Sequence, residues 1–425
     1  MLHSLRRRRR SAVLGTTLLL ASSVLHSAQS VWVVDDDGGP DVDFTDIQPA
    51  VLASAAGDVI LVRSGIYGPV TIGRSKTVQA DDGAVVRLHD PSLPLGGFPL
   101  LTIQNLDVGE EVYVRGLIVG ASYFHPFGVP QEALRVTNSA GEVWLEDVHV
   151  EKVIHAVAQG IVVRDSAGVT FSRCSVTSDF SFQKFSTVYG PGLESFASNV
   201  ALFDTRIQAG IGGRQTPGAD GVVVHGGTLY ASGCQVLGGD GYDGTSFDPE
   251  GTDGGDGLVL DDGAVVRLQD CTVAGGSGGV AGPGGSSGVP GANTVVSDGS
   301  LVPVQGTSRS LVEASPVRAG TDAFVETLRG QPGDLAYRLY STDGQLAPLY
   351  IAFEKAPLVL DLNLFGDVLG PVDPDGTLVQ TAPSAPMPAG VDGAVITTQA
   401  SFLAADGTGF YFSAPSAITL VASSL

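Results

Sequence analysis

A short apolar phrase recurs between residues 101 and 296, and a second phrase follows nearly every copy of it in register. Copies of the first phrase start at Leu101, Leu134, Gly160, Gly192, Gly221, Gly257 and, in a weaker form, Thr294. Copies of the second phrase occupy residues 112–119, 143–150, 169–176, 200–207, 229–236 and 266–273. The starts lie roughly 27 to 37 residues apart, and the variation falls in the connections. This pattern predicts a solenoid in which each repeat forms one coil.

Alternation inside the second phrase predicts which side chains enter the core. One inward column contains Val114, Leu145, Phe171, Leu202, Ala231 and Leu268, and another contains Val119, Val150, Val176, Ile207, Val236 and Val273. The column between them is mostly polar and is predicted to face water: Arg115, Glu146, Ser172, Phe203, Ser232 and Gln269. Like residues should then stack about 4.8 Å apart along the axis.

A sharp bend is predicted in the middle of each second phrase. The residues at this position are Gly116, Asp147, Arg173, Asp204, Gly233 and Asp270. Glycine and aspartate tolerate the left-handed backbone conformation that such a bend requires, whereas Arg173 departs from this pattern. Each coil is therefore expected to contain a strand, a bend, a short strand, a loop and a further strand.

The segment before the repeats has the features of a solenoid cap. Val31–Val34 reads as a strand, and apolar residues at helical spacing over residues 44–56 predict a helix with Pro49 in its first turn. Residues 57–67 match the pattern GD-x-I-x-V-x-x-G-x-Y. The segment should cover the open end of the stacked core.

Together, the repeats and this opening pattern resemble the right-handed parallel β-helix proteins of the pectin-lyase-like superfamily. The resemblance covers roughly residues 31–305. It implies an all-β chain containing a right-handed parallel β-helix with an N-terminal capping helix. The bend in that superfamily is often asparagine, whereas here it is mostly glycine or aspartate.

The coil pattern stops near residue 305, and we expect a linker over 306–317 followed by a small β-sandwich over 318–425. Its expected strands are 337–340, 349–353, 358–362, 395–402, 410–412 and 418–421. The unit resembles C-terminal domains appended to large secreted proteins of environmental bacteria. Docking or surface attachment is our hypothesis for it.

Charge and the N-terminus bear on location and partners. The 425 residues carry a formal net charge of −22, which makes nucleic acid an unfavourable partner. Residues 1–30 read as a signal peptide, because Arg6–Arg10 precede an apolar run over 12–25 and small residues at 28–30. We therefore expect a secreted or cell-surface protein, monomeric and without a membrane span after signal removal.

Three cysteines fall in one inward column of the predicted coils, at Cys174, Cys234 and Cys271. Parallel side chains on neighbouring coils suit packing better than the crossed geometry of a disulfide. Buried free thiols are the prediction, and a disulfide is the alternative.

Two connections are rich in glycine. Residues 275–291 contain nine glycines and no charge, and are expected to be a flexible connection. Residues 238–257 contain eight glycines and six acids, and oxygen ligands on such a loop suit calcium. The candidate calcium ligands are Asp240, Asp243, Asp253 and Asp256, and the alternative is a solvated acidic loop with no cofactor.

Candidate site residues lie on the outward face of the first phrase. Its outward column contains Gln104, Thr137, Arg164, Phe196, His225, Asp261 and Ser297. Glu194 is expected to point outward beside this column, so that Arg164, Glu194, His225 and Asp261 form one polar stripe. Aromatic residues in the loops over 122–131 and 178–191 either hold a sugar ring or pack over the side of the solenoid.

In the superfamily, substrates lie across these first strands, so the stripe is the candidate catalytic site. A lyase needs a base, often arginine, and a cation to neutralise the uronate, whereas a hydrolase needs two carboxylates. Here the Asn-Thr-Asp and Gly-His-Gly motifs of polygalacturonases are absent, and Asp261-Asp262 falls at a strand end. Three functions remain open: a non-catalytic binder of polysaccharide or another surface, a lyase or hydrolase of acidic, pectin-like glycans with a degenerate site, and a structural or adhesive spacer.

Overall fold

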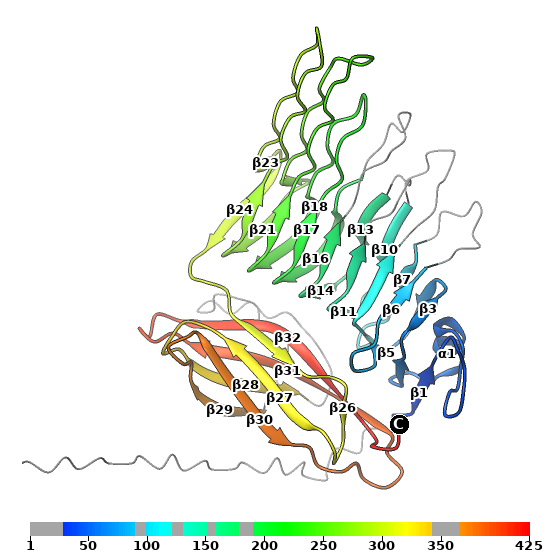
Figure 1. Ribbon diagram of the computed structural model, residues 1–425. Coiled ribbons are helices and arrows are strands. Elements are labelled where there is room, and N and C mark those ends of the chain that lie inside the picture. Colours follow the sequence, from blue (N-terminus) through cyan, green and yellow to red (C-terminus); the bar gives the residue numbers. More distant parts are fainter. Residues whose placement is uncertain (1–28, 90–98, 121–130, 152–157, 178–189, 342–364) are drawn as a thin grey trace, which may run out of the picture.

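The computed structural model describes residues 29–89, 99–120, 131–151, 158–177, 190–341 and 365–425. These residues form a parallel β-helix, with a smaller β unit lying along its side (Figure 1). The signal-peptide prediction for residues 1–30 falls almost entirely outside the described residues. The same is true of most of both aromatic loops and of the strands predicted at 349–353 and 358–362.

The first phrase of each repeat forms one row of parallel strands. In spatial order this row contains β4 (Val70–Ile72), β7 (Leu101–Gln104), β10 (Gln131–Thr137), β13 (Ala158–Arg164), the first part of β16 (Leu193–Phe203), the first part of β18 (Val222–Ser232), β20 (Leu258–Asp261) and β23 (Thr294–Val296). Leu134 lies opposite Leu101 on one side and Ile161 on the other. The register read from the sequence is therefore confirmed.

The first half of the second phrase forms a second parallel row. It runs through β1 (Val31–Val34), β2 (Val59–Val62), β5 (Lys76–Ala80), β8 (Glu111–Arg115), β11 (Glu142–Glu146), β14 (Gly168–Ser172), the later parts of β16 and β18, β21 (Ala264–Gln269) and β24 (Gly299–Val304). In β16 and β18 the chain turns from the first row to the second without ending the strand.

The second half of the phrase forms the third row, after the bend. This row contains β3 (Gly65–Tyr67), β6 (Val86–Leu88), β9 (Leu117–Gly120), β12 (His149–Glu151), β15 (Ser175–Thr177), β17 (Arg206–Gln208), β19 (Gln235–Leu237) and β22 (Thr272–Ala274). All six predicted bend residues have positive φ, between 47° and 76°. Arg173 shares this conformation at φ 52°, so its coil is no exception in geometry.

The inward columns build one continuous core along the solenoid. Phe171, Leu145 and Leu202 are at most 1% exposed, and Cys174 and Cys234 lie in the same cluster. All three cysteines are free, which confirms the predicted thiols. Cys271, near the last coil, is only partly buried against the core.

The N-terminal end of this core is covered by α1 (Ile47–Ala53). The helix is shorter than the spacing over 44–56 predicted, because the Asp46 carboxylate caps its first turn by accepting from the Ile47 amide at 2.8 Å. Ile47, Ala50 and Val51 are buried against the core. With seven residues, α1 is the longest helix in the described part of the chain, and no helix there has the length and apolarity to cross a membrane.

The glycine-rich connections form a layered projection, which we call the glycine stem: residues 210–220, 238–257 and 275–293 (green to yellow-green, at the top of Figure 1). Backbone hydrogen bonds join the layers, such as Gly241 N–H to the Ser277 carbonyl at 2.7 Å and Gly279 N–H to the Thr252 carbonyl at 2.8 Å. The expectation of a flexible connection over 275–291 is therefore wrong.

A three-residue period explains the glycines of the stem. Glycines recur at positions 276, 279 and 282 on the way out, and at 285, 288 and 291 on the way back. A Cβ atom at any of these six would lie within 2.5 Å of a carbonyl oxygen in residues 238–257. Only glycine therefore fits these positions, as in other close-packed chains with three residues per turn.

The C-terminal unit contains two sheets. One holds β25 (Ser310–Glu313), β27 (Ala323–Arg329) and β30 (Thr377–Pro383), and the other holds β26 (Val317–Arg318), β32 (Phe410–Val421), β31 (Gly393–Leu403), β28 (Leu335–Ser341) and β29 (Phe365–Pro371). Leu311 and Leu328 of the first sheet pack against Ala400 and Phe402 of the second, which makes a sandwich. Its first strand begins at residue 310, inside the segment expected to be a linker.

This sandwich covers the outer face of the second row. Tyr113, Trp144, Phe203 and Tyr230 of the coils form one apolar cluster with Phe412 of β32. The column predicted to face water is therefore buried: Arg115 is 9% exposed and Glu146 is 0% exposed. That prediction was wrong because the two charged residues of this column, Arg115 and Glu146, pair with each other and with groups of the sandwich instead of with water.

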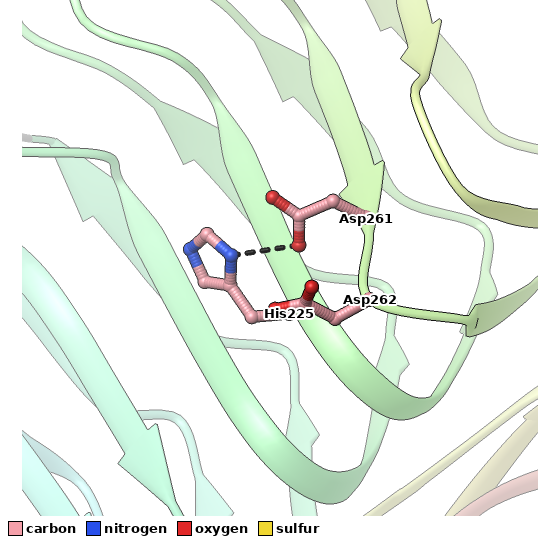
Figure 2. A group of neighbouring side chains, drawn as sticks. All are labelled: His225, Asp261 and Asp262. Atoms are coloured by element: carbon pink, nitrogen blue, oxygen red, sulfur yellow. Dashed lines mark hydrogen bonds and ion pairs between the residues drawn. The ribbon is translucent and has the colours of Figure 1, made fainter.

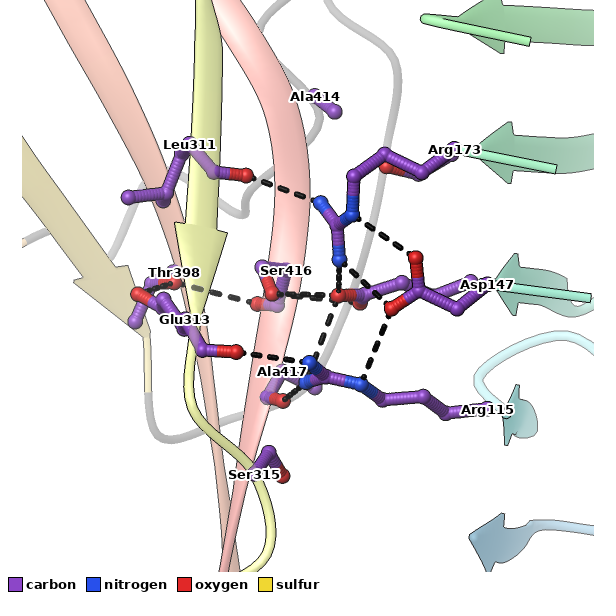
Figure 3. Close-up of polar contacts among 12 residues, drawn as sticks. Arg115, Asp147, Arg173, Leu311, Glu313, Ser315, Thr398, Ala414, Ser416 and Ala417 are labelled. Atoms are coloured by element: carbon purple, nitrogen blue, oxygen red, sulfur yellow. Dashed lines mark hydrogen bonds and ion pairs between the residues drawn. The ribbon is translucent and has the colours of Figure 1, made fainter. Parts of the chain in front are cut away.

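Glu146 is the centre of this contact. Its carboxylate accepts from the hydroxyls of Tyr113, at 2.7 Å, and Ser416, at 3.0 Å, and pairs with the guanidinium groups of Arg115 and Arg173. The two arginines also donate to backbone carbonyls of β25, at Glu313 and Leu311 (Figure 3). Although burial opposes ionisation, the two guanidinium charges lower the pKa of Glu146 below its ordinary value.

Candidate functional site

Four strands of the first row carry the polar stripe predicted from the sequence. Arg164, Phe196, His225 and Asp261 occupy matching positions on β13, β16, β18 and β20. Glu194 lies two residues before Phe196 on β16 and points to the same side of the sheet. The structure therefore brings together all four predicted residues: Arg164, Glu194, His225 and Asp261.

The side chains of Arg164, Phe196 and His225 stack along the row. The Arg164 guanidinium carbon lies 3.7 Å from the centroid of the Phe196 ring, within the range of a cation–π contact. The Phe196 and His225 rings are stacked, with centroids 4.5 Å apart and an interplanar angle of 18°. Both faces of Phe196 are therefore occupied, and the plane of the imidazole is fixed.

Two carboxylates bind the edges of the same imidazole. His225 Nδ1 lies 2.7 Å from Asp261 Oδ1, and Nε2 lies 3.2 Å from Glu194 Oε1 (the Asp261 contact is drawn in Figure 2). The three side chains are partly accessible, with exposed fractions of 23% for His225, 15% for Glu194 and 32% for Asp261. The group is accessible to a ligand.

Asp262 joins this group, although the sequence pattern did not select it as a site residue. One ligand atom each from His225, Asp261 and Asp262 lies within 4.8 Å of the others (Figure 2). Asp262 follows the end of β20 with φ at 50°, and this turn carries its carboxylate toward the histidine. The sequence contains a signal for this group: the pair Asp261-Asp262 is in register with His225, one coil earlier.

This arrangement is unfavourable for glycoside hydrolysis. An inverting enzyme keeps its two carboxyl groups roughly 6.5–9.5 Å apart so that a water molecule fits between the sugar and the base. Here the His225 ring occupies the space between Glu194 and Asp261, since it contacts both carboxylates. The pair therefore holds an imidazole where a hydrolase would hold its substrate.

The four candidate calcium ligands of the glycine stem are not brought together. Among the described residues, none of them belongs to a group of three ligand atoms within 4.8 Å. Each carboxylate instead accepts a backbone N–H from the next layer at 2.7–2.8 Å, and the pairs are Asp240 with Ser277, Asp243 with Val280, Asp253 with Val289 and Asp256 with Ala292. These acids hold the layers of the stem in register, and the geometry does not support the predicted calcium site.

Comparison with known proteins adds little to this description. No family model matches this chain. No curated protein matches it either. Among solved structures, a polygalacturonase from Erwinia carotovora ssp. carotovora is similar at 9% sequence identity and a TM-score of 0.25, over 58% of this chain and 94% of that one. The β-helix is established by its own strand registers.

Proposed function

We propose that this chain is an exported, non-catalytic β-helix protein that binds polysaccharide through the polar stripe Arg164, Glu194, His225 and Asp261. The observation that carries the proposal is the gathering of these charges, of both signs, on a sheet face that the C-terminal unit leaves uncovered. Arg164 is exposed and the other three are partly exposed. The opposite polar column is buried under the sandwich, so it offers no such surface.

The chemistry of the stripe suits hydroxyl-rich ligands. Carboxylates accept hydrogen bonds from sugar hydroxyls, and a guanidinium donates to ring and hydroxyl oxygens. Four parallel strands at about 4.8 Å spacing extend the stripe over about 15 Å, which suits an extended chain. Because Phe196 is covered on both faces, recognition rests on polar contacts. The net charge of −22 favours a neutral glycan over an acidic one.

Binding to a panel of insoluble neutral and acidic polysaccharides tests the proposal. We expect the wild type to be retained on a neutral member, and Arg164→Ala and Asp261→Asn each to weaken retention at least tenfold. Glu151→Ala, on the third row, should bind like the wild type. Release of soluble products would instead favour the lyase or hydrolase alternative, and no retention on any member would favour the structural spacer.

A further inference from the structure

The end of β20 and the corner of β18 form a group of mixed nitrogen and oxygen ligands. We propose that His225, Asp261 and Asp262 bind a divalent transition-metal ion of the zinc class. Their candidate ligand atoms all lie within 4.8 Å of one another (Figure 2). Small side-chain adjustments are sufficient for the three to share an ion at the usual 2.0–2.2 Å ligand distances.

The donor set selects the kind of ion. One imidazole nitrogen and two carboxylate oxygens suit zinc and related first-row metals, whereas calcium takes six to eight oxygen ligands. Three protein ligands also leave a coordination position open, because zinc is usually four-coordinate. The partial exposure of His225 and Asp261 places that position within reach of solvent or of a ligand oxygen.

Glu194 supplies a feature that an accidental cluster would lack. A histidine that ligates a metal through one nitrogen commonly donates its other N–H to a carboxylate, which fixes the tautomer. Glu194 Oε1 lies 3.2 Å from His225 Nε2, so with an ion between Nδ1 and the Asp261 carboxylate, which lie 2.7 Å apart, the hydrogen belongs on Nε2 and is donated to Glu194. Phe196 holds the ring plane by stacking at 4.5 Å. The imidazole is therefore oriented for ligation before an ion binds.

The corner at Gly226 allows the approach of Asp262. Gly226 has φ at 68°, and a Cβ atom there would lie 3.3 Å from the Asp262 carbonyl oxygen. The absence of a side chain at this corner lets the segment after β20 pack directly beside the residue that follows His225. Two neighbouring coils thus contribute ligands to one point.

A second acidic group provides a matched comparison. Asp35, Asp36 and Asp37 also lie within 4.8 Å of one another, but without a histidine. Two of the three carboxylates have structural partners: Asp35 accepts from the Asp37 amide and pairs with Arg63, and Asp36 accepts from the Ile66 amide at 2.8 Å. We expect this group to bind no zinc.

Calorimetric titration of the full chain with Zn²⁺, together with visible spectroscopy of the Co²⁺ form, tests the site without any glycan. We expect one ion per chain, loss of binding in His225→Ala and Asp262→Ala, and roughly 10- to 100-fold weaker binding in Glu194→Gln. Asp37→Asn and His149→Ala should bind as the wild type does. Asp262 is exposed, so its replacement removes no buried contact.

Unchanged zinc affinity in Asp262→Ala, or tighter binding of Ca²⁺ than of Zn²⁺, would overturn the inference. The site does not depend on the proposed glycan, and the two can fail separately. Zinc binding without retention on polysaccharide would leave the metal site standing and remove the proposed function. If the wild type binds no zinc and Asp262→Ala is still retained on polysaccharide, the proposed function stands and the metal site is removed.

Discussion

Burial governs the reactivity of the three thiols more than neighbouring charge does. Burial raises the pKa of Cys174 to about 12 and raises that of Cys234 well above its ordinary value. Cys271, near the last coil, is less enclosed, and a hydrogen bond donated by the Cys234 thiol lowers its pKa. The same inward column therefore contains thiols of very different reactivity.

Alkylation should reveal this order. In the native protein at neutral pH, iodoacetamide should modify Cys271 first, because the thiolate is the reactive form and Cys271 is the most accessible of the three. Cys174 and Cys234 should react only after unfolding. Mass spectrometry of peptides from timed samples measures the order, and equal rates at Cys174 and Cys271 would contradict it.

Glu142 should make stability depend on pH. Burial raises the pKa of its carboxyl from about 4.5 to about 7. The folded state therefore holds a proton that the unfolded state releases between these pH values, and stability falls as pH rises through this window, by at most about 3 kcal/mol.

Glu142→Gln tests this assignment, because glutamine is neutral throughout the window. Urea unfolding at pH 5 and pH 8 should show a smaller difference in the free energy of unfolding for the variant than for the wild type. An equal difference in the two proteins would show that Glu142 does not titrate in this range.

At the scale of elements, local rules predicted the coils well. Gly116, Asp147 and three other bend residues fit the left-handed bend by their conformational tolerance, because that bend is a local requirement, whereas Arg173 was placed by its register in the repeat. The four stripe residues could be grouped for a similar reason: parallel pairing places matching positions of successive coils side by side. Their contacts depend on rotamers and on the turn at Asp262, which periodicity does not describe.

The sandwich strands were harder to predict. Expected strands at 337–340 and 395–402 lie within β28 and β31, whereas β25, β26, β27, β29 and β30 were missed. Residues 410–412 and 418–421 proved to be parts of one strand, β32. Pro415 lies within this strand, next to the point where the pairing with β31 shifts register, a position at which proline is tolerated.

A single added methyl group should destabilise the glycine stem. At Gly279 a Cβ atom would lie 1.9 Å from the Tyr242 carbonyl oxygen, so Gly279→Ala should separate the layers. Hydrogen exchange should show protected amides over residues 275–291 in the wild type and faster exchange in the variant. Val280→Ala is the control, because that side chain is 65% exposed and its loss should leave protection unchanged.

At the scale of the whole molecule, the solenoid and the sandwich are joined by a buried face. The sequence predicted both units but not their contact, because pairing between residues as distant as Glu146 and Ser416 leaves no periodic trace. One signal was available: Tyr113, Trp144 and Tyr230 occupy an outward column, and large aromatic residues gathered on an outer face mark an interface.

Glu146→Ala should weaken this contact strongly. Removal of the carboxylate leaves Arg115 and Arg173 buried without their shared partner, which should cost about 3–5 kcal/mol of stability in urea unfolding. Glu151→Ala is the matched control, since its pair with Arg87 is exposed and should contribute less than about 1 kcal/mol. Equal losses in the two variants would contradict a central role for Glu146.

The pairing inside the glycine stem also limits how this projection can change in length. Five of the six acids in residues 238–257 accept from the amide found 36 or 37 residues later, and glycine must return at every third position. An insertion of one or two residues would place a side chain against a neighbouring backbone. The glycine stem can therefore become longer or shorter only by three residues at a time, with the same change in each adjacent layer. Homologous chains should therefore differ in stem length by coordinated steps of three.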